Sequence, residues 1–84
     1  MNEKLILADG TELSGHGIET ETRLFLYIYE QTLKGVFDLM IDPEKIKTIR
    51  SDRYGEKGKY TGYKRLVSVS EERGGMICAV LKKN

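Results

Sequence analysis

The chain has 84 residues, of which 39% are apolar and 32% charged, and this length suffices for a single domain spanning residues 1–84. Its one cysteine, Cys78, excludes an internal disulfide and gives no sign of an oxidising compartment. No apolar run reaches the roughly 18 residues that a membrane helix needs, and the N-terminal residues lack a signal-peptide pattern. These features predict a soluble, cytoplasmic protein with no membrane partner.

Charge is segregated along the chain, although the net charge is only +1. Residues 1–44 carry three basic and nine acidic side chains, whereas residues 45–65 carry eight basic and two acidic ones. Such segregation can mark a binding face, or it can reflect two neighbouring strands that complement each other within one fold.

The first predicted element is a β-hairpin. Residues 4–8 are short and apolar, and Asp9-Gly10 is a favoured tight turn because both positions tolerate positive φ. Residues 11–13 are predicted to form the returning strand. The glycines within residues 14–17 make a poor strand, so a loop or a bulge is expected there.

The strongest strand signal lies at residues 23–30. Alternation places three aliphatic side chains on one face, Leu24, Leu26 and Ile28, and three aromatic ones on the other, Phe25, Tyr27 and Tyr29. β-branched and aromatic residues suit a pleated surface. The strand is therefore either central and covered on both faces, or it offers its aromatic face to a partner.

An amphipathic helix is predicted over residues 32–41. Its apolar residues recur at helical spacing: Leu33, Val36, Phe37, Met40 and Ile41. Thr32 is the expected N-cap, and Leu33, Val36, Phe37 and Met40 are the expected contribution to the core. Pro43 should end the helix near Ile41, and Asp42 could cap a second short helical turn.

The remaining residues predict a three-stranded meander. A polar strand is expected at residues 46–54, a hairpin loop at 55–58, one long strand at 59–70 kinked at Gly62, a turn at 71–75 and a closing strand at 76–81. The predicted fold class is α+β: a small antiparallel β-sheet or partly closed β-barrel of about five to six strands with one short helix, at about residues 32–41.

Catalytic chemistry finds little support in the sequence. His16 is the only histidine and is expected in an exposed loop, and Cys78 is expected to be a small buried hydrophobe. The carboxylates Asp38, Asp42 and Glu44 match no metal-loop spacing and suit a helix cap and a solvated face. The prediction is a protein that is not an enzyme, with no catalytic, cofactor-binding or metal-binding residues and no cofactor.

The basic segment suggests one alternative function. Basic side chains neutralise phosphates and exposed rings stack on unpaired bases. A nucleic-acid-binding hairpin at residues 46–65 would use Arg50, Arg53, Tyr54, Lys59, Tyr60, Tyr63 and Lys64.

Several short motifs carry a resemblance. They are LKGVFDLMIDPEKIKTI at residues 33–49, YTGYKRL at residues 60–66 and GGMI at residues 74–77. In layout and in these motifs the chain resembles small uncharacterised proteins encoded by phages and prophages of Gram-positive, gut Firmicutes-type bacteria. The resemblance implies a virion-assembly or tail-associated binding protein without catalysis, and it carries over no functional residue.

The preferred functional prediction is a protein–protein interaction or assembly module whose partner is itself or another protein, as a homo-oligomer or a virion component. The candidate interface is the stripe of Phe25, Tyr27 and Tyr29. The exposed edge of the hairpin at residues 46–65 is a further candidate contact, because an unpaired strand edge is a natural docking site. A cytoplasmic location, including assembly into a phage particle, follows from this interpretation.

Overall fold

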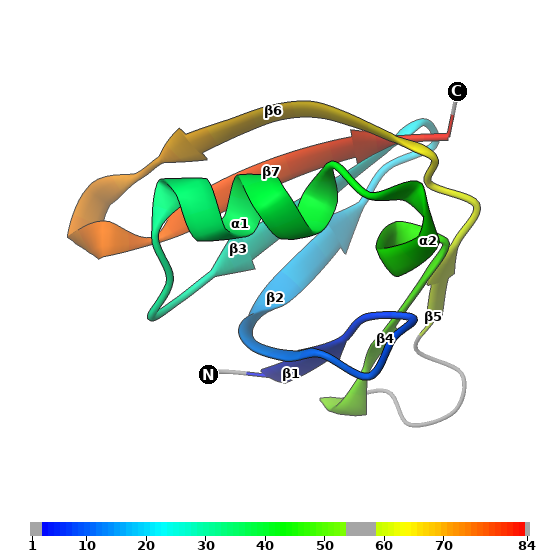
Figure 1. Cartoon of the computed structure of the whole chain (residues 1–84), viewed down its shortest axis with the longest axis horizontal. Helices are drawn as coiled ribbons and strands as arrows, with labels where there is room; N and C mark the ends of the chain where they lie inside the picture. Colours follow the sequence, from blue (N-terminus) through cyan, green and yellow to red (C-terminus); the bar gives the residue numbers. More distant parts are fainter. Residues whose placement is uncertain (1–2, 54–58, 84) are drawn as a thin grey trace.

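The computed structural model describes residues 3–53 and 59–83, the side chain of Lys59 excepted. Within these residues the chain forms two short helices and seven strands (Figure 1). In chain order the elements are β1 (Glu3–Ile6), β2 (Glu12–Glu19), β3 (Arg23–Ile28), α1 (Leu33–Met40), α2 (Pro43–Ile46), β4 (Thr48–Ser51), β5 (Lys59–Thr61), β6 (Arg65–Glu71), a 3-10 turn η2 (Arg73–Gly75) and β7 (Ile77–Lys82).

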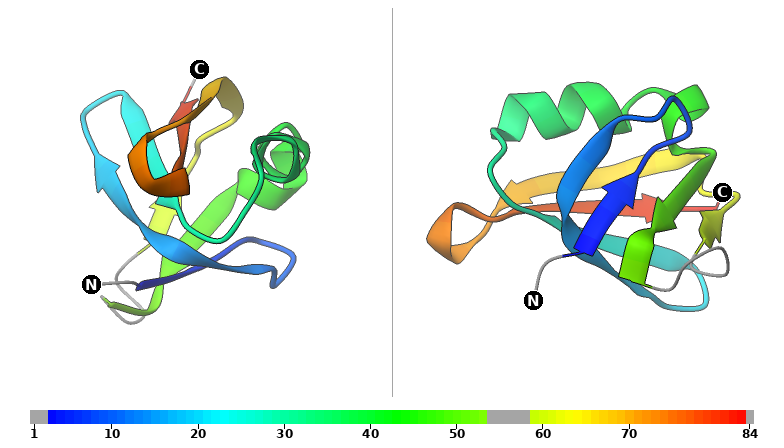
Figure 2. Two further views of the ribbon diagram at one scale, coloured as in Figure 1. Left: turned by 90° about the vertical axis from the view of Figure 1, so that its left-hand side faces the viewer. Right: turned by 90° about the horizontal axis from the view of Figure 1, so that it is seen from below.

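The described strands form one antiparallel sheet in the order β5-β4-β1-β2-β3-β7-β6. The sheet curls strongly but its two ends do not pair, and α1 packs over β6 and β7 (Figure 2). The α+β class with an antiparallel sheet is confirmed, whereas the expected five to six strands are too few. Because the sheet curls, it buries the core without closing into a barrel.

The predicted long strand at residues 59–70 is wrong. It is two strands, β5 and β6, which lie at opposite edges of the sheet. Gly62 has φ +84°, a conformation that glycine adopts easily, and the chain there leaves β5 to join β7 as β6. The expected meander is therefore wrong too, since β6 pairs with β7 and not with β4. Likewise residues 46–54 do not form one strand: Ile46 ends α2, and β4 stops at Ser51.

The first hairpin is confirmed, with Gly10 at φ +92° in its turn. The expected loop or bulge at residues 14–17 is wrong, because these residues belong to β2 and pair with β3. Glycine is favoured at positions 15 and 17 because neighbouring atoms leave little room for a side chain. A Cβ on Gly15 would collide with the carbonyl oxygen of Tyr27, and a Cβ on Gly17 would lie 3.0 Å from the Tyr60 ring.

Both helices begin at the predicted caps. The Thr32 side chain accepts a hydrogen bond from the Gly35 amide at 3.0 Å, and the Asp42 side chain accepts one from the Glu44 amide at 2.9 Å. Pro43 occupies the first turn of α2, where its missing N–H costs nothing. The local sequence signals at these two positions therefore suffice to start each helix.

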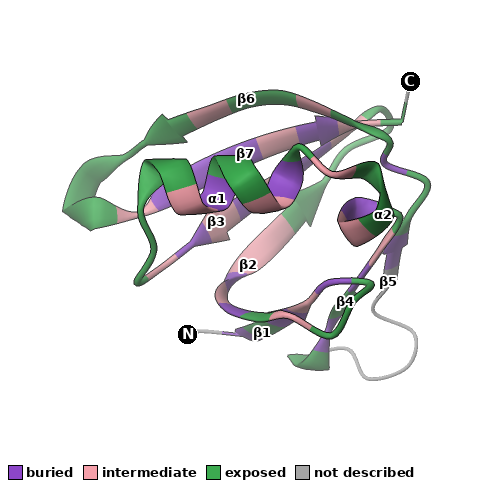
Figure 3. Cartoon of the chain, in the orientation of Figure 1, coloured by how far each residue is buried: buried purple, intermediate pink, exposed green. Residues whose placement is uncertain are grey.

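The core lies between the inner face of the sheet and the two helices. Val36 and Met40 supply the buried side of α1, above the aliphatic face of β3. Leu33 and Phe37, expected in this core, are instead 44% and 45% exposed. Both side chains line a groove beside β6, the last of the described strands. Much of α1 and β6 is exposed on this side of the molecule (Figure 3).

Candidate protein-interaction site

The outer face of β3 carries the aromatic side chains that the sequence singles out. Leu24, Leu26 and Ile28 are buried beneath the helices, and Phe25, Tyr27 and Tyr29 are half-buried on the opposite face. β3 is flanked by β2 on one side and by β7 on the other. The three rings therefore lie near the middle of a sheet face that neither helix covers.

Neighbouring strands extend these rings into a wider patch. In the sheet register, Tyr27 lies between His16 of β2 and Cys78 of β7, and Phe25 lies between Ile18 and Val80. We call this surface the outer aromatic patch. Its members are His16, Ile18, Phe25, Tyr27, Tyr29 and Val80.

Ring contacts order the centre of the patch. The His16 and Tyr27 rings stack with centroids 5.1 Å apart and an interplanar angle of 21°, and the His16 and Tyr29 centroids are 6.2 Å apart. Burial raises the pKa of Tyr27 above its usual value, and the neighbouring Cys78 raises it further. Burial likewise raises the pKa of the Cys78 thiol. Both groups therefore stay neutral near pH 7, which suits a surface that is desolvated when a partner binds.

The rim of the patch is more open to solvent. Ile18 is 51% exposed, which makes it one of the most exposed large apolar side chains of the described chain. Contiguous apolar and aromatic surface of this kind is typical of contacts between proteins. Aromatic side chains also lose little conformational entropy when they are fixed in an interface.

Sequence reasoning missed His16, Ile18 and Val80. The strand-breaking glycines beside His16 suggested a loop, so its alignment with Tyr27 was not foreseen. The alternation of His16 and Ile18 with Gly15 and Gly17 is the signal that could have revealed it, because it leaves bulky side chains on one face only.

The residues of the predicted nucleic-acid hairpin are brought together only in part: Arg50 of β4 pairs with Lys59 of β5 in the sheet. Tyr60 is 8% exposed, and Tyr63 is fully buried. Lys64 leads into β6 at the far edge of the sheet, away from exposed Arg50 in β4. Tyr54 and the side chain of Lys59 lie outside the described residues. Buried rings cannot stack on bases, so Tyr60 and Tyr63 do not offer the stacking surfaces that this alternative proposed for them.

The buried tyrosines instead attach β5 and the segment that follows it to β2. The Tyr60 hydroxyl donates to the Gly17 carbonyl at 3.5 Å, and the Tyr63 hydroxyl donates to the Glu19 carboxylate. Burial raises the pKa of Tyr63 far above its usual value, and the Glu19 carboxylate raises it further. The Lys83 ammonium lies 5.3 Å from the centre of the Tyr63 ring.

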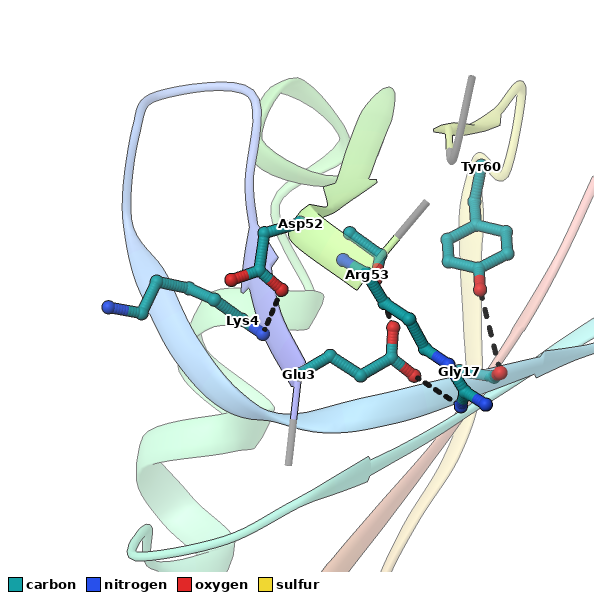
Figure 4. Close-up of polar contacts among 7 residues, drawn as sticks. Glu3, Lys4, Gly17, Asp52, Arg53 and Tyr60 are labelled. Atoms are coloured by element: carbon teal, nitrogen blue, oxygen red, sulfur yellow. Dashed lines mark hydrogen bonds and ion pairs between the residues drawn. The ribbon is translucent and has the colours of Figure 1, made fainter. Parts of the chain in front are cut away.

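A polar cluster lies at the end of β4, beside β1 (Figure 4). Glu3 of β1 is buried, its carboxylate accepts a hydrogen bond from the Ser51 hydroxyl, and it lies 3.8 Å from the Arg53 guanidinium. The Lys4 amide donates to the Asp52 carboxylate at 2.8 Å. The Glu3–Arg53 contact pairs an acidic side chain of residues 1–44 with a basic one of residues 45–65, which explains part of the charge segregation as packing within the fold.

The three carboxylates near the helices have ordinary partners. Asp38 forms an ion pair with Lys34 at 2.7 Å, Glu44 forms one with Lys47 at 3.0 Å, and Asp42 caps α2. Within residues 3–53 and 59–83, no group of three or more His, Cys, Asp or Glu side chains is arranged to hold a metal ion.

Comparisons with known proteins give no relative for this chain: no family model, no curated protein and no solved structure matches it. None of the helices in the described part of the chain has the length and apolar character needed to cross a membrane. The outer aromatic patch therefore has to be interpreted from its own chemistry.

Proposed function

We propose that this protein is a non-enzymatic assembly module that acts by contact with other protein chains, copies of itself first, through the outer aromatic patch. Such a module would suit a phage or prophage particle or its tail, as the resemblance of the sequence implies. The observation that carries the proposal is the position of Phe25, Tyr27 and Tyr29, half-buried on the sheet face opposite the helices.

The composition of the patch favours a protein partner over a small ligand. Its surface is a broad sheet face formed by three adjacent strands, with rings at the centre and exposed Ile18 toward one side. Tyrosine combines a large apolar area with a hydroxyl that stays hydrogen-bonded, and it is enriched where proteins meet. A protein partner would therefore gain both apolar burial and polar contacts at this surface.

Light scattering after size exclusion tests the proposal, at about 50 and 500 mM salt, because salt screens charge contacts but not apolar ones. A short mixed single-stranded oligonucleotide is added in a parallel run. We expect a salt-resistant oligomer that ignores the oligonucleotide. Tyr27→Glu and the more exposed Ile18→Glu should each lower its mass, whereas Thr61→Glu, at an exposed position of β5, should not.

Two results would contradict the proposal. An oligomer whose mass survives both patch variants does not use this surface. A monomer that shifts only with the oligonucleotide at low salt would favour nucleic-acid binding. Thermal unfolding of each variant shows whether it remains folded, and Ile18→Glu keeps the test valid should Tyr27→Glu unfold.

A further inference from the structure

A second surface lies at the β6 edge, where an apolar groove separates the edge strand from α1. The groove has a volume of about 430 Å³. The helix lines it with Leu33, Phe37 and Ile41, and the strand lines it with Leu66, Val67 and Val69. Phe37 is 45% exposed and Val67 is 48% exposed, so apolar surface faces solvent on both walls.

The backbone of β6 is available for pairing along the same groove. β6 is the last strand of the sheet and has a neighbour, β7, on one side only. The Glu72 amide donates to the Met76 carbonyl at 2.6 Å. Because hydrogen-bonding direction alternates in an antiparallel strand, the N–H and C=O groups of Val69 and Glu71 point away from β7. These groups can pair with an added strand.

A bulge shapes this edge. The register with β7 shifts between Leu66 and Ser68, which leaves Val67 as an extra residue. Its side chain is turned into the groove and is not paired across the sheet. The bulge lies near the middle of β6, so an added strand would pair with residues on both sides of it.

The charges at the two ends of β6 are opposite. Exposed Lys64 and Arg65 begin the strand, and Lys82 of β7 lies opposite Arg65. Exposed Glu71 and Glu72 end it, before Arg73 in the turn. When two copies of β6 pair in antiparallel fashion, the basic end of each meets the acidic end of the other. The strand is therefore complementary to itself.

We propose that the occupant of this edge is a second copy of the chain, whose β6 pairs antiparallel with β6 and continues the sheet across a twofold axis. Such an interface is isologous, so both copies contribute the same surface. Because the axis is perpendicular to the sheet, both α1 helices stay on one face. Their exposed Leu33, Phe37 and Ile41 side chains, which line the groove, would then face each other over the joint.

Together with the outer aromatic patch, this edge would give each chain two different self-contacts. Two isologous interfaces on one chain join dimers into larger assemblies, whereas either one alone stops at a dimer. The inference does not depend on the patch, because the patch lies on the sheet face opposite the helices and the groove lies between α1 and the β6 edge. Each surface can therefore be removed without the other.

Charge-swapped variants test the pairing in a background where the patch no longer contributes: Tyr27→Glu, or the more exposed Ile18→Glu should Tyr27→Glu unfold. Variant A carries Lys64→Glu and Arg65→Glu, and variant B carries Glu71→Lys and Glu72→Lys. All four side chains are exposed, so folding should be retained. A and B alone should each dimerise at least about tenfold more weakly than the parent, because like charges are brought together.

Mixing A with B should restore a dimer that contains one copy of each, since both ends of the pair are again complementary. Native mass spectrometry identifies this mixed species, and its affinity should fall at about 500 mM salt. Three results would overturn the inference: a monomeric parent, A or B that dimerises as well as the parent, or a mixture that stays monomeric. An unchanged mass on Tyr27→Glu alone would instead contradict the aromatic patch.

Discussion

The two edges of the sheet differ in how far the fold covers them. The β5 edge is a strand of only three residues, Lys59–Thr61, and the Tyr60 ring from it packs onto β2 at Gly17. The β6 edge is seven residues long, its side chains are mostly exposed, and an apolar groove runs beside it. One edge is folded into the domain and the other is left open.

Each difference has a physical cause in the chain. β2 carries glycine at position 17, so its inner face has room for the Tyr60 ring from β5. Beside β6, α1 buries only a narrow stripe of side chains. Val36 and Met40 reach the core, while Phe37 faces the groove. Natural proteins shorten or cover strand edges to avoid unwanted pairing. An uncovered edge of this length therefore favours a role in pairing with another chain.

The largest effect on stability is expected from removing Tyr63, which anchors the segment after β5 to the rest of the fold. Tyr63→Ala deletes a fully buried ring that joins the segment between β5 and β6 to Glu19 of β2. Loss of a buried aromatic side chain costs about 3–5 kcal/mol. Tyr63→Phe, which keeps the ring and loses only the hydroxyl, should cost about 1 kcal/mol. Urea unfolding measures both, and equal costs would contradict a packing role for the ring.

Alkaline pH should weaken the same anchor. The pKa of Tyr63 is raised in the folded state, while an unfolded tyrosine ionises near pH 10, at about its usual value. Stability from this group is therefore complete below about pH 10 and is lost as pH rises above it, by at most about 1.4 kcal/mol per pH unit. The free energy of unfolding, measured in urea from pH 8 to 11, should fall more steeply for wild type than for Tyr63→Phe.

Sequence reasoning succeeded where a signal was local. Thr32 and Asp42 cap the two helices as predicted, Asp9-Gly10 turns the first hairpin, and the alternation in β3 sorts its two faces correctly. It failed where partners are distant in the chain. Nothing local to residues 59–70 says that β5 and β6 join opposite edges, because that choice depends on which strands pair.

The candidate site follows the same rule. Phe25, Tyr27 and Tyr29 could be found from period-two alternation, but His16 and Ile18 join them only through the register of β2. The glycines beside His16 were misleading because strand propensity counts them as breakers, whereas packing against Tyr60 requires a small residue at Gly17. Long-range packing overrides propensity at this position.

A smaller effect on stability should show why β2 has glycine at position 17, next to Tyr60 of β5. A Cβ at position 17 would lie 3.0 Å from the Tyr60 ring, so Gly17→Ala should cost about 1 kcal/mol, at the low end for overpacking. In a Tyr60→Leu background the ring is gone, and the same change should stabilise by about 0.5–1 kcal/mol because alanine suits a strand better than glycine. Additive effects in this double-mutant cycle would rule out the steric explanation.

The smallest effect is expected on the open side, where two valines of β6 give a matched pair. Val69 packs against the core, so Val69→Thr buries a hydroxyl and should cost about 1 kcal/mol or more. Val67 is 48% exposed at the bulge, so Val67→Thr should change the free energy of unfolding by no more than about 0.5 kcal/mol relative to its parent. Unfolding is measured in the charge-swapped variant A, which keeps pairing of β6 from contributing. A cost at Val67 equal to that at Val69 would mean that the groove wall is core, and the β6 edge would then be as closed as the β5 edge.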